Sequence, residues 1–174
     1  MEQIRRANTE DAEQIAWLGR TTFTETFEHL FRDSEDLETY LANTFSVQKI
    51  ENSLQKASNA YWIAFKDELP VGYAKLKLKS PSEFIKGHNV GQLQKIYVTK
   101  EFISKKYGKR LQDLLLAEAR KVGVDEIWLS VLNGNKRAIN FYEKNGFREV
   151  GYHKFSIGKE TFSFRAMSKR LRRA

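Results

Sequence analysis

The stretch Asn135-Lys-Arg-Ala-Ile-Asn-Phe-Tyr-Glu-Lys-Asn-Gly-Phe147 decides the fold, because it predicts a short helix directly after a buried strand. Asn135 can cap this helix by accepting a hydrogen bond from a first-turn N–H group, and Gly146 can end it in a left-handed conformation. In front of it, Ile127-Trp-Leu-Ser-Val131 has the length and the β-branched, aromatic content of a core strand. Ligands of α/β folds bind where a strand ends beside a helix N-terminus, so Tyr142 is the first candidate for chemistry.

The rest of the chain predicts helices first and then a mixture of strands and helices. The expected elements are a strand at 4–7, a helix from 8 to about 27, two short helices beginning at 34 and 46, a hairpin of 60–65 and 71–78, a strand at 92–98, a helix at 108–122 and a closing hairpin of 148–156 and 160–169. This order predicts an α+β fold, an α/β/α sandwich around one mainly antiparallel sheet, with a parallel pair where the helix at 108–122 crosses over. The length of 174 residues favours a single domain, residues 1–174.

Two local patterns in the first hairpin lead to further expectations. The polar run Lys66-Asp-Glu-Leu-Pro70 predicts a five-residue turn between the two strands. The second strand ends in an alternation of leucine and lysine that includes Lys75 and Lys77, which predicts that one face of this strand meets solvent.

Composition excludes several functional classes. The chain has no cysteine, and its three histidines (His29, His88 and His153) show no ligand spacing, so we expect neither disulfides nor a metal site. The N-terminus lacks the apolar run of a signal peptide, and no segment approaches the roughly 20 apolar residues of a membrane span, which predicts a cytoplasmic protein without a membrane partner. The net charge of +8 favours an anionic partner, such as a nucleic acid, a phosphate-bearing cofactor or an acidic lipid.

Three motifs in a fixed order then point to a family. They are Gln92-Leu-Gln-Lys-Ile-Tyr-Val98, Ser104-Lys-Lys-Tyr-Gly-Lys-Arg-Leu111 and the stretch 135–147. Together they resemble the GNAT superfamily of N-acetyltransferases over nearly the whole chain. Three further segments, 22–27, 71–76 and 153–158, resemble the PaiA-type spermine/spermidine acetyltransferase branch. The resemblance implies a central, mostly antiparallel mixed sheet of seven strands, flanked by helices, with a V-shaped opening between strands 4 and 5.

The resemblance also implies that acetyl-CoA lies in this opening. Backbone groups of Ile96, Tyr97 and Val98 would bind its pantetheine arm, and Asn135 and Ala138 would contact it from the next helix. Its pyrophosphate would lie on the amides of the loop and helix start formed by Ser104, Lys105, Lys106, Tyr107, Gly108 and Lys109. Independently of the family, the lysines of this helix start oppose the helix dipole and favour an anion, although a merely solvated basic face stays open.

The phosphate loop departs from the family pattern. Its usual form is Gln/Arg-x-x-Gly-x-Gly/Ala, whereas the segment Ile103–Gly108 keeps only the last glycine. Lys106 reaches positive φ less readily than glycine does, so either the loop conformation differs or the backbone is strained. Weaker cofactor binding is one possible consequence.

The same resemblance assigns the chemistry. Tyr142 would be the general acid that protonates the leaving thiolate, because a phenol with a pKa near 10 is protonated at neutral pH; the alternative is that Tyr142 is only a core aromatic residue. Glu25, Glu28 and Asp33 are the expected substrate contacts for a small-molecule amine, above all a polyamine such as spermidine or spermine. His29 and His153 could relay a proton.

Other functions stay open at this point. The same fold could acetylate a protein, a peptide or an antibiotic, because a fold does not determine the acceptor. A non-catalytic basic module that binds nucleic acid or CoA is the alternative from another class, but the chain lacks nucleic-acid-binding signatures, so we expect no nucleic-acid partner. The oligomeric state is open, with a homodimer as one possibility.

Overall fold

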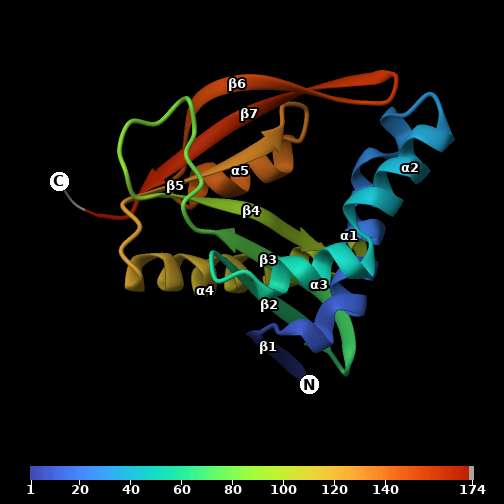
Figure 1. Ribbon diagram of the computed structural model, residues 1–174, viewed down its shortest axis with the longest axis horizontal. Helices are drawn as coiled ribbons and strands as arrows, with labels where there is room; N and C mark the ends of the chain where they lie inside the picture. The colour runs from blue at the N-terminus through green and yellow to red at the C-terminus, as the bar shows by residue number, and fades with distance from the viewer. Residues whose placement is uncertain (173–174) are drawn as a thin grey trace.

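A seven-stranded sheet forms the centre of the structure, a computed structural model that describes residues 1–172 (Figure 1). Its strands are β1 (Glu2–Arg6), β2 (Asn59–Lys66), β3 (Leu69–Lys77), β4 (Val90–Val98), β5 (Glu126–Leu132), β6 (Arg148–Ile157) and β7 (Glu160–Arg170), in the spatial order β1-β2-β3-β4-β5-β7-β6. All neighbouring pairs are antiparallel except β4 with β5. The predicted α+β fold with a mostly antiparallel mixed sheet is confirmed.

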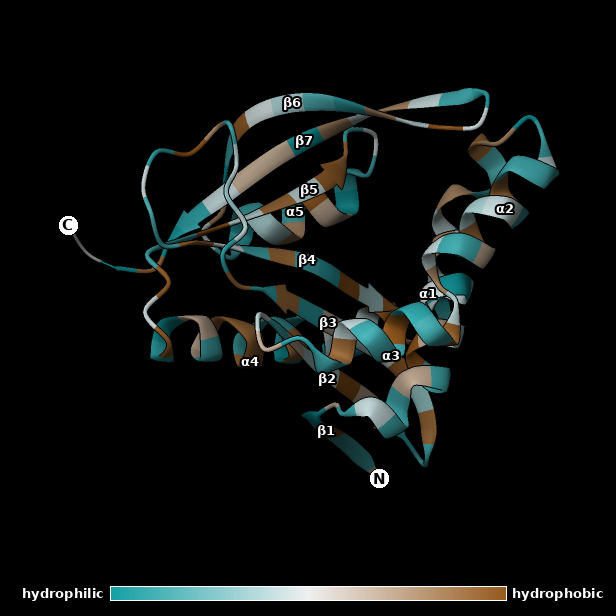
Figure 2. Cartoon of the chain, viewed as in Figure 1, coloured by the Kyte–Doolittle hydropathy of each residue, from teal (hydrophilic) through white to brown (hydrophobic). Residues whose placement is uncertain are grey.

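Helices cover both faces of the sheet and bury two separate apolar cores (Figure 2). One face packs against α1 (Ala12–Phe27), α2 (Ser34–Thr44) and α3 (Val47–Gln55), and the other against α4 (Tyr107–Lys121) and α5 (Lys136–Lys144). Three short 3-10 turns, η1 (Thr9–Asp11), η2 (Glu28–Leu30) and η3 (Lys100–Lys105), connect these elements. None of the helices within residues 1–172 is long and apolar enough to cross a membrane.

The single parallel pair of strands is short. β4 and β5 are paired only from Val90 to Gln92 and from Glu126 to Trp128, although both strands continue for several residues beyond these positions. β5 pairs along its whole length with β7, and β4 pairs with β3, so neither strand is free to close the gap. The two strands therefore separate toward their carboxyl ends, and the V-shaped opening lies where it was predicted.

One expectation about the first hairpin was wrong. The turn consists of only Asp67 and Glu68, both at positive φ (49° and 69°), and β3 already begins at Leu69. A two-residue turn with positive φ matches the twist of its flanking strands, but it usually carries Asn-Gly or Asp-Gly, so its sequence signal is missing here. At the end of β3, Lys75 and Lys77 are half-exposed and alternate with the buried Leu76, so this face meets solvent in part, although α1 and α3 cover much of it.

The packing of α1 against Phe45, the residue that follows α2, depends on one small residue. A Cβ atom added to Gly19 would lie 2.3 Å from Cδ1 of Phe45, whose ring is fully buried. Gly19→Ala should therefore lower the free energy of unfolding by about 1–2 kcal/mol, because the clash outweighs the helix propensity that alanine gains. Chemical denaturation measures this change.

Gly134→Ala is the matched control, because a Cβ atom at Gly134 would have no neighbour within 4 Å. This variant should be as stable as the unchanged protein or slightly more stable. Equal stability of the two variants would contradict the close packing of α1 on Phe45.

Candidate active site

A cleft of about 490 Å³ opens where β4 and β5 separate. Its walls are formed by β4 and β5 together with α1, the η3–α4 junction, α5 and β7. A cleft of this size, lined by a mixture of apolar side chains and a few polar ones, is typical of a small-molecule site.

Backbone groups of β4 that have no β-sheet partner within residues 1–172 face this cleft. The N–H of Thr99 donates to the carbonyl of Val71 on β3 at 2.9 Å. Because the backbone groups of successive strand residues point to opposite sides, those of Ile96 and Val98 point away from β3 and into the gap. The backbone of Tyr97 points toward β3, and its side chain instead lines the cleft.

The N-terminus of α4 forms one end of the cleft. The first helical hydrogen bond runs from the N–H of Arg110 to the carbonyl of Lys106 at 3.1 Å, and the side chain of Lys106 makes no cap. The N–H groups of Tyr107, Gly108 and Lys109 therefore precede the helical ladder, and such groups attract anions. Ser104, Lys106, Gly108 and Lys109 all line the cleft.

Lys106 has a left-handed backbone conformation, with φ 68° and ψ 10°. The chain thus keeps the turn that a glycine would make with less strain, and places a lysine side chain beside the helix start. Of the two alternatives for this glycine-poor loop, the structure shows the strained backbone.

Two of the predicted cofactor residues lie outside the cleft lining. The side chain of Tyr107 is 1% exposed, and its hydroxyl donates to the carboxylate of Glu2 at 3.0 Å, which connects α4 to β1. Lys105 is exposed in η3 and is absent from the lining. Of these two, only the backbone N–H of Tyr107 belongs to the uncapped helix start.

Tyr142 lies on α5, in the local structure that the sequence predicts. Asn135 caps this helix by accepting from the N–H of Ala138 at 3.2 Å, and Gly146 follows the helix at φ 91°. Tyr142 is 8% exposed, packs edge-on against Phe147 in the core, and lines the cleft. Burial raises the pKa of Tyr142, so its hydroxyl stays protonated at neutral pH.

The acidic residues expected to bind substrate are used elsewhere or point to solvent. A carboxylate oxygen of Glu25 accepts from the backbone N–H of Lys100 at 3.0 Å, and so holds α1 against the end of β4. Glu28 is exposed in η2. Neither residue is part of the cleft lining in the described part of the chain.

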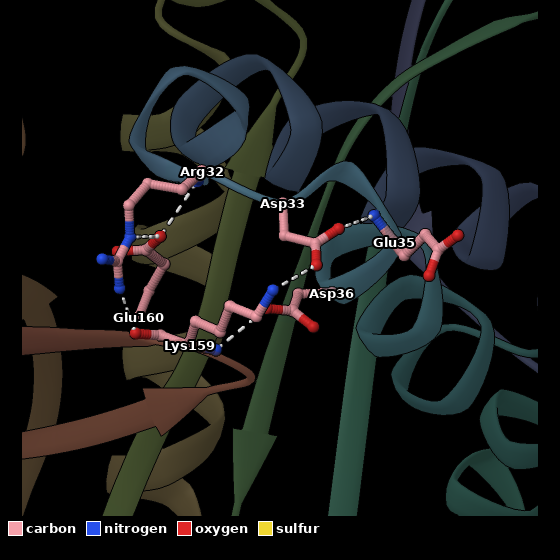
Figure 3. A network of polar contacts seen from close by, with 6 residues as sticks. All are labelled: Arg32, Asp33, Glu35, Asp36, Lys159 and Glu160. Carbon is pink, nitrogen blue, oxygen red and sulfur yellow. Dashed lines mark hydrogen bonds and ion pairs between the residues drawn. The ribbon is translucent and has the colours of Figure 1, made fainter.

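Asp33 anchors the closing hairpin (Figure 3). Its carboxylate accepts from the N–H of Glu35, which caps α2, and from the ammonium group of Lys159 at 2.9 Å. On the same side, Arg32 bonds to Glu160 at 2.8 Å. These contacts hold the β6–β7 turn against α2, so Asp33 supports a wall of the site and does not line it.

Sequence reasoning missed several side chains of the cleft. Gln94 is the extra residue of a β-bulge, opposite Lys75 and Leu76 of β3, and its buried amide oxygen has no hydrogen-bond partner within residues 1–172. Thr22, Thr26, Lys95, Arg137 and Ser130 also line the cleft. Bulges of this kind occur next to active sites, but the sequence carries no signal for this one.

The histidines are placed differently from one another. Nε2 of His153 lies 2.7 Å from the hydroxyl oxygen of Ser130, and the imidazole ring stacks on Phe164. His153 therefore touches two residues of the cleft lining, whereas His29 is exposed in η2. No group of three or more His, Asp or Glu side chains in the described residues could hold a metal ion.

The charged side chains of the cleft all have one sign. Lys95, Lys106, Lys109 and Arg137 line it, and none of the lining side chains within residues 1–172 is acidic. The cleft therefore suits an anionic ligand.

Comparison with known proteins agrees with this geometry. The model of the acetyltransferase (GNAT) family matches residues 14–147. The structure of a PaiA N-acetyltransferase from Thermoplasma acidophilum in complex with coenzyme A is 25% identical, with a TM-score of 0.76 over 98% of this chain and 99% of that one. An uncharacterized N-acetyltransferase in the pepI 3' region of Lactobacillus delbrueckii subsp. lactis is 24% identical over 158 residues, 91% of each chain. The Escherichia coli ribosomal-protein-S18-alanine N-acetyltransferase shares the fold, with a TM-score of 0.69 at 19% identity over 100% of this chain and 96% of that one.

The strain at Lys106 can be measured with two variants that both remove its charge. Lys106→Gly should be more stable than Lys106→Ala by about 1 kcal/mol, because a Cβ atom disfavours the left-handed conformation. Urea denaturation gives both free energies of unfolding. Equal values would show that this position is not held at positive φ in solution.

Proposed function

Because the chain belongs to the acetyltransferase (GNAT) family, we propose that it transfers an acetyl group from acetyl-CoA to a primary amine. The observation that carries the proposal is the position of Tyr142, a buried phenol that lines the same cleft as the free backbone groups of β4 and the uncapped start of α4. One proton donor thus lies beside two features that suit a ligand with an amide-containing arm and phosphate groups.

The residues of the cleft fit acetyl-CoA. Ile96 and Val98 would bind the pantetheine arm as they would bind an added strand, with Asn135 and Ala138 on the facing helix. The N–H groups at the start of α4 would bind the pyrophosphate. Three cationic side chains, Lys106, Lys109 and Arg137, would add attraction for the phosphate charges.

Bound acetyl-CoA would supply a thioester, whose carbonyl carbon is attacked by the neutral amine. As the new carbon–nitrogen bond forms and the carbon–sulfur bond breaks, the hydroxyl of Tyr142 would donate a proton to the departing sulfur and would then regain one from solvent. Burial raises the pKa of Tyr142 and keeps its hydroxyl protonated at neutral pH. The same apolar surroundings would raise the pKa of the departing thiol and so favour its protonation. His153, next to the cleft-lining Ser130, can relay the proton that the amine loses.

The identity of the acceptor amine is the more specific part of the proposal. The branch resemblance and the similarity to a PaiA N-acetyltransferase support a polyamine such as spermidine. The similarity in fold to a ribosomal-protein-S18-alanine N-acetyltransferase supports a peptide as the alternative acceptor. The charges of the cleft weigh against a polycation, because Glu25, Glu28 and Asp33 lie outside its lining. A cytoplasmic location and a homodimer stay predictions from the sequence.

Acetyl-CoA should bind and raise the melting temperature, because a ligand that binds only the folded state stabilises it by mass action. Calorimetry measures the affinity and differential scanning fluorimetry the shift. If millimolar acetyl-CoA produced neither heat of binding nor a shift, the assignment of the cleft to this ligand would be wrong.

Tyr142→Phe should lower kcat by about 100-fold or more and leave the Kd of acetyl-CoA nearly unchanged, because only a proton donor of the transition state is lost. Thiol release under single-turnover conditions separates the chemical step from product release.

Tyr97→Phe is the matched control, because Tyr97 is a second phenol of the cleft, and burial raises its pKa to about 12. This variant should retain most of the turnover. A larger loss in Tyr97→Phe than in Tyr142→Phe would transfer the role of general acid to Tyr97.

A further inference from the structure

Lys95 is a cationic side chain of the cleft that lies apart from the expected phosphate site. Strand alternation places Lys95 and Tyr97 on the face of the sheet that α1 and α2 cover, whereas Ile96 and Val98 pack on the face covered by α4. The α4 start with Lys106 lies on that second face. The sheet therefore separates Lys95 from the groups that suit phosphates, and leaves it beside Thr22 and Thr26 of α1.

Among the residues that the structure describes, the ammonium group of Lys95 has no anionic partner. Its Nζ atom lies 5.3 Å from the ring centre of Phe45 and 5.4 Å from that of Tyr97. Within residues 1–172 it takes part in no ion pair and no hydrogen bond. Aromatic faces attract the charge but leave the three N–H donors of the ammonium free.

The surroundings of Lys95 increase its need for an anion. Burial lowers the pKa of Lys95, so the protein environment by itself disfavours the charged form. Its cross-strand neighbour Lys75 has a pKa lowered to about 8, first by burial and then by nearby lysines that include Lys95. Lys95 is half-buried, and charges that are partly removed from water are normally paired, so an ammonium that lines a cleft without a partner in the described residues is suited to a negatively charged group of a ligand.

We propose that the acceptor amine also carries a carboxylate, and that Lys95 binds this carboxylate. The proposal rests on the proposed acetyl transfer and adds the class of acceptor, a small amino acid or a similar amino-carboxylate. One ammonium group matches a singly charged carboxylate, whereas a phosphate dianion would call for more donors. The same positive charge would disfavour a polyamine in the cleft.

Matched pairs of acceptors test this directly: glycine with methylamine, L-lysine with cadaverine and L-phenylalanine with phenethylamine, each compared by thiol release, with spermidine as the polyamine. The members of a pair differ in the carboxylate. They also differ in the basicity of the amine, but this difference cancels when the ratio of kcat/KM within a pair is compared between the unchanged protein and a variant. We expect at least one amino acid to be used with a higher kcat/KM than its decarboxylated partner and than spermidine.

Lys95→Met should lower kcat/KM for the preferred amino acid at least about 10-fold more than for its decarboxylated partner, because a charge-assisted contact is lost. Lys75→Met is the control, since Lys75 carries the same charge one strand away and is absent from the cleft lining. It should change the two members of a pair almost equally. The melting temperature shows whether each variant is folded, and calorimetry shows whether it binds acetyl-CoA.

The outcomes are distinguishable. Better use of spermidine or of the decarboxylated amines, or an equal loss for both members of a pair in Lys95→Met, would overturn the carboxylate proposal and leave acetyl transfer intact. The same selective loss in Lys75→Met would indicate that the overall positive charge of this region, and not direct contact with Lys95, favours the carboxylate. This result would also overturn the proposal. Absence of thiol release with every amine tested would overturn acetyl transfer to small amines, and the carboxylate proposal with it.

Discussion

The separation of β4 from β5 is the constraint on which the rest of the site depends. Two strands of one sheet normally satisfy each other's backbone groups, yet these two are paired over only three positions. β5 is held by seven register positions with β7, and β4 by its pairing with β3, which includes the bulge at Gln94. A bulge bends and twists its strand, so β4 diverges at this point and exposes the backbone groups of Ile96 and Val98.

The two faces of the sheet give the two ends of the cleft different chemistry. On one face, α4 and α5 bring an uncapped helix start and Tyr142 to the opening. On the other face, α1 and α2 are held in place by contacts over long sequence distances, such as Glu25 with Lys100 and Asp33 with Lys159. Because these carboxylates are occupied in holding the walls together, the charge that remains inside the cleft is positive.

The fold and part of the site could be predicted from the sequence because their signals are local. Asn135 and Gly146 mark the ends of α5 through their own backbone preferences, and the order of strands and helices limits the topology. The roles of Glu25 and Asp33 could not be predicted, because their partners lie 75 and 126 residues away. Strand alternation places Lys95 on the face of the sheet that Ile96 does not share, so its separation from Ile96 could have been predicted. No local signal shows that helices cover this face.

The most direct test of the strand gap as the binding surface is amide hydrogen exchange in β4, measured with and without saturating acetyl-CoA. If the strand gap is the binding surface, the amides of Ile96 and Val98 should exchange rapidly in the free protein and slow down on binding. The amide of Thr99, which already bonds to Val71, should change much less. Slow exchange of Ile96 and Val98 in the free protein, or unchanged exchange at a saturating concentration of acetyl-CoA, would contradict the account.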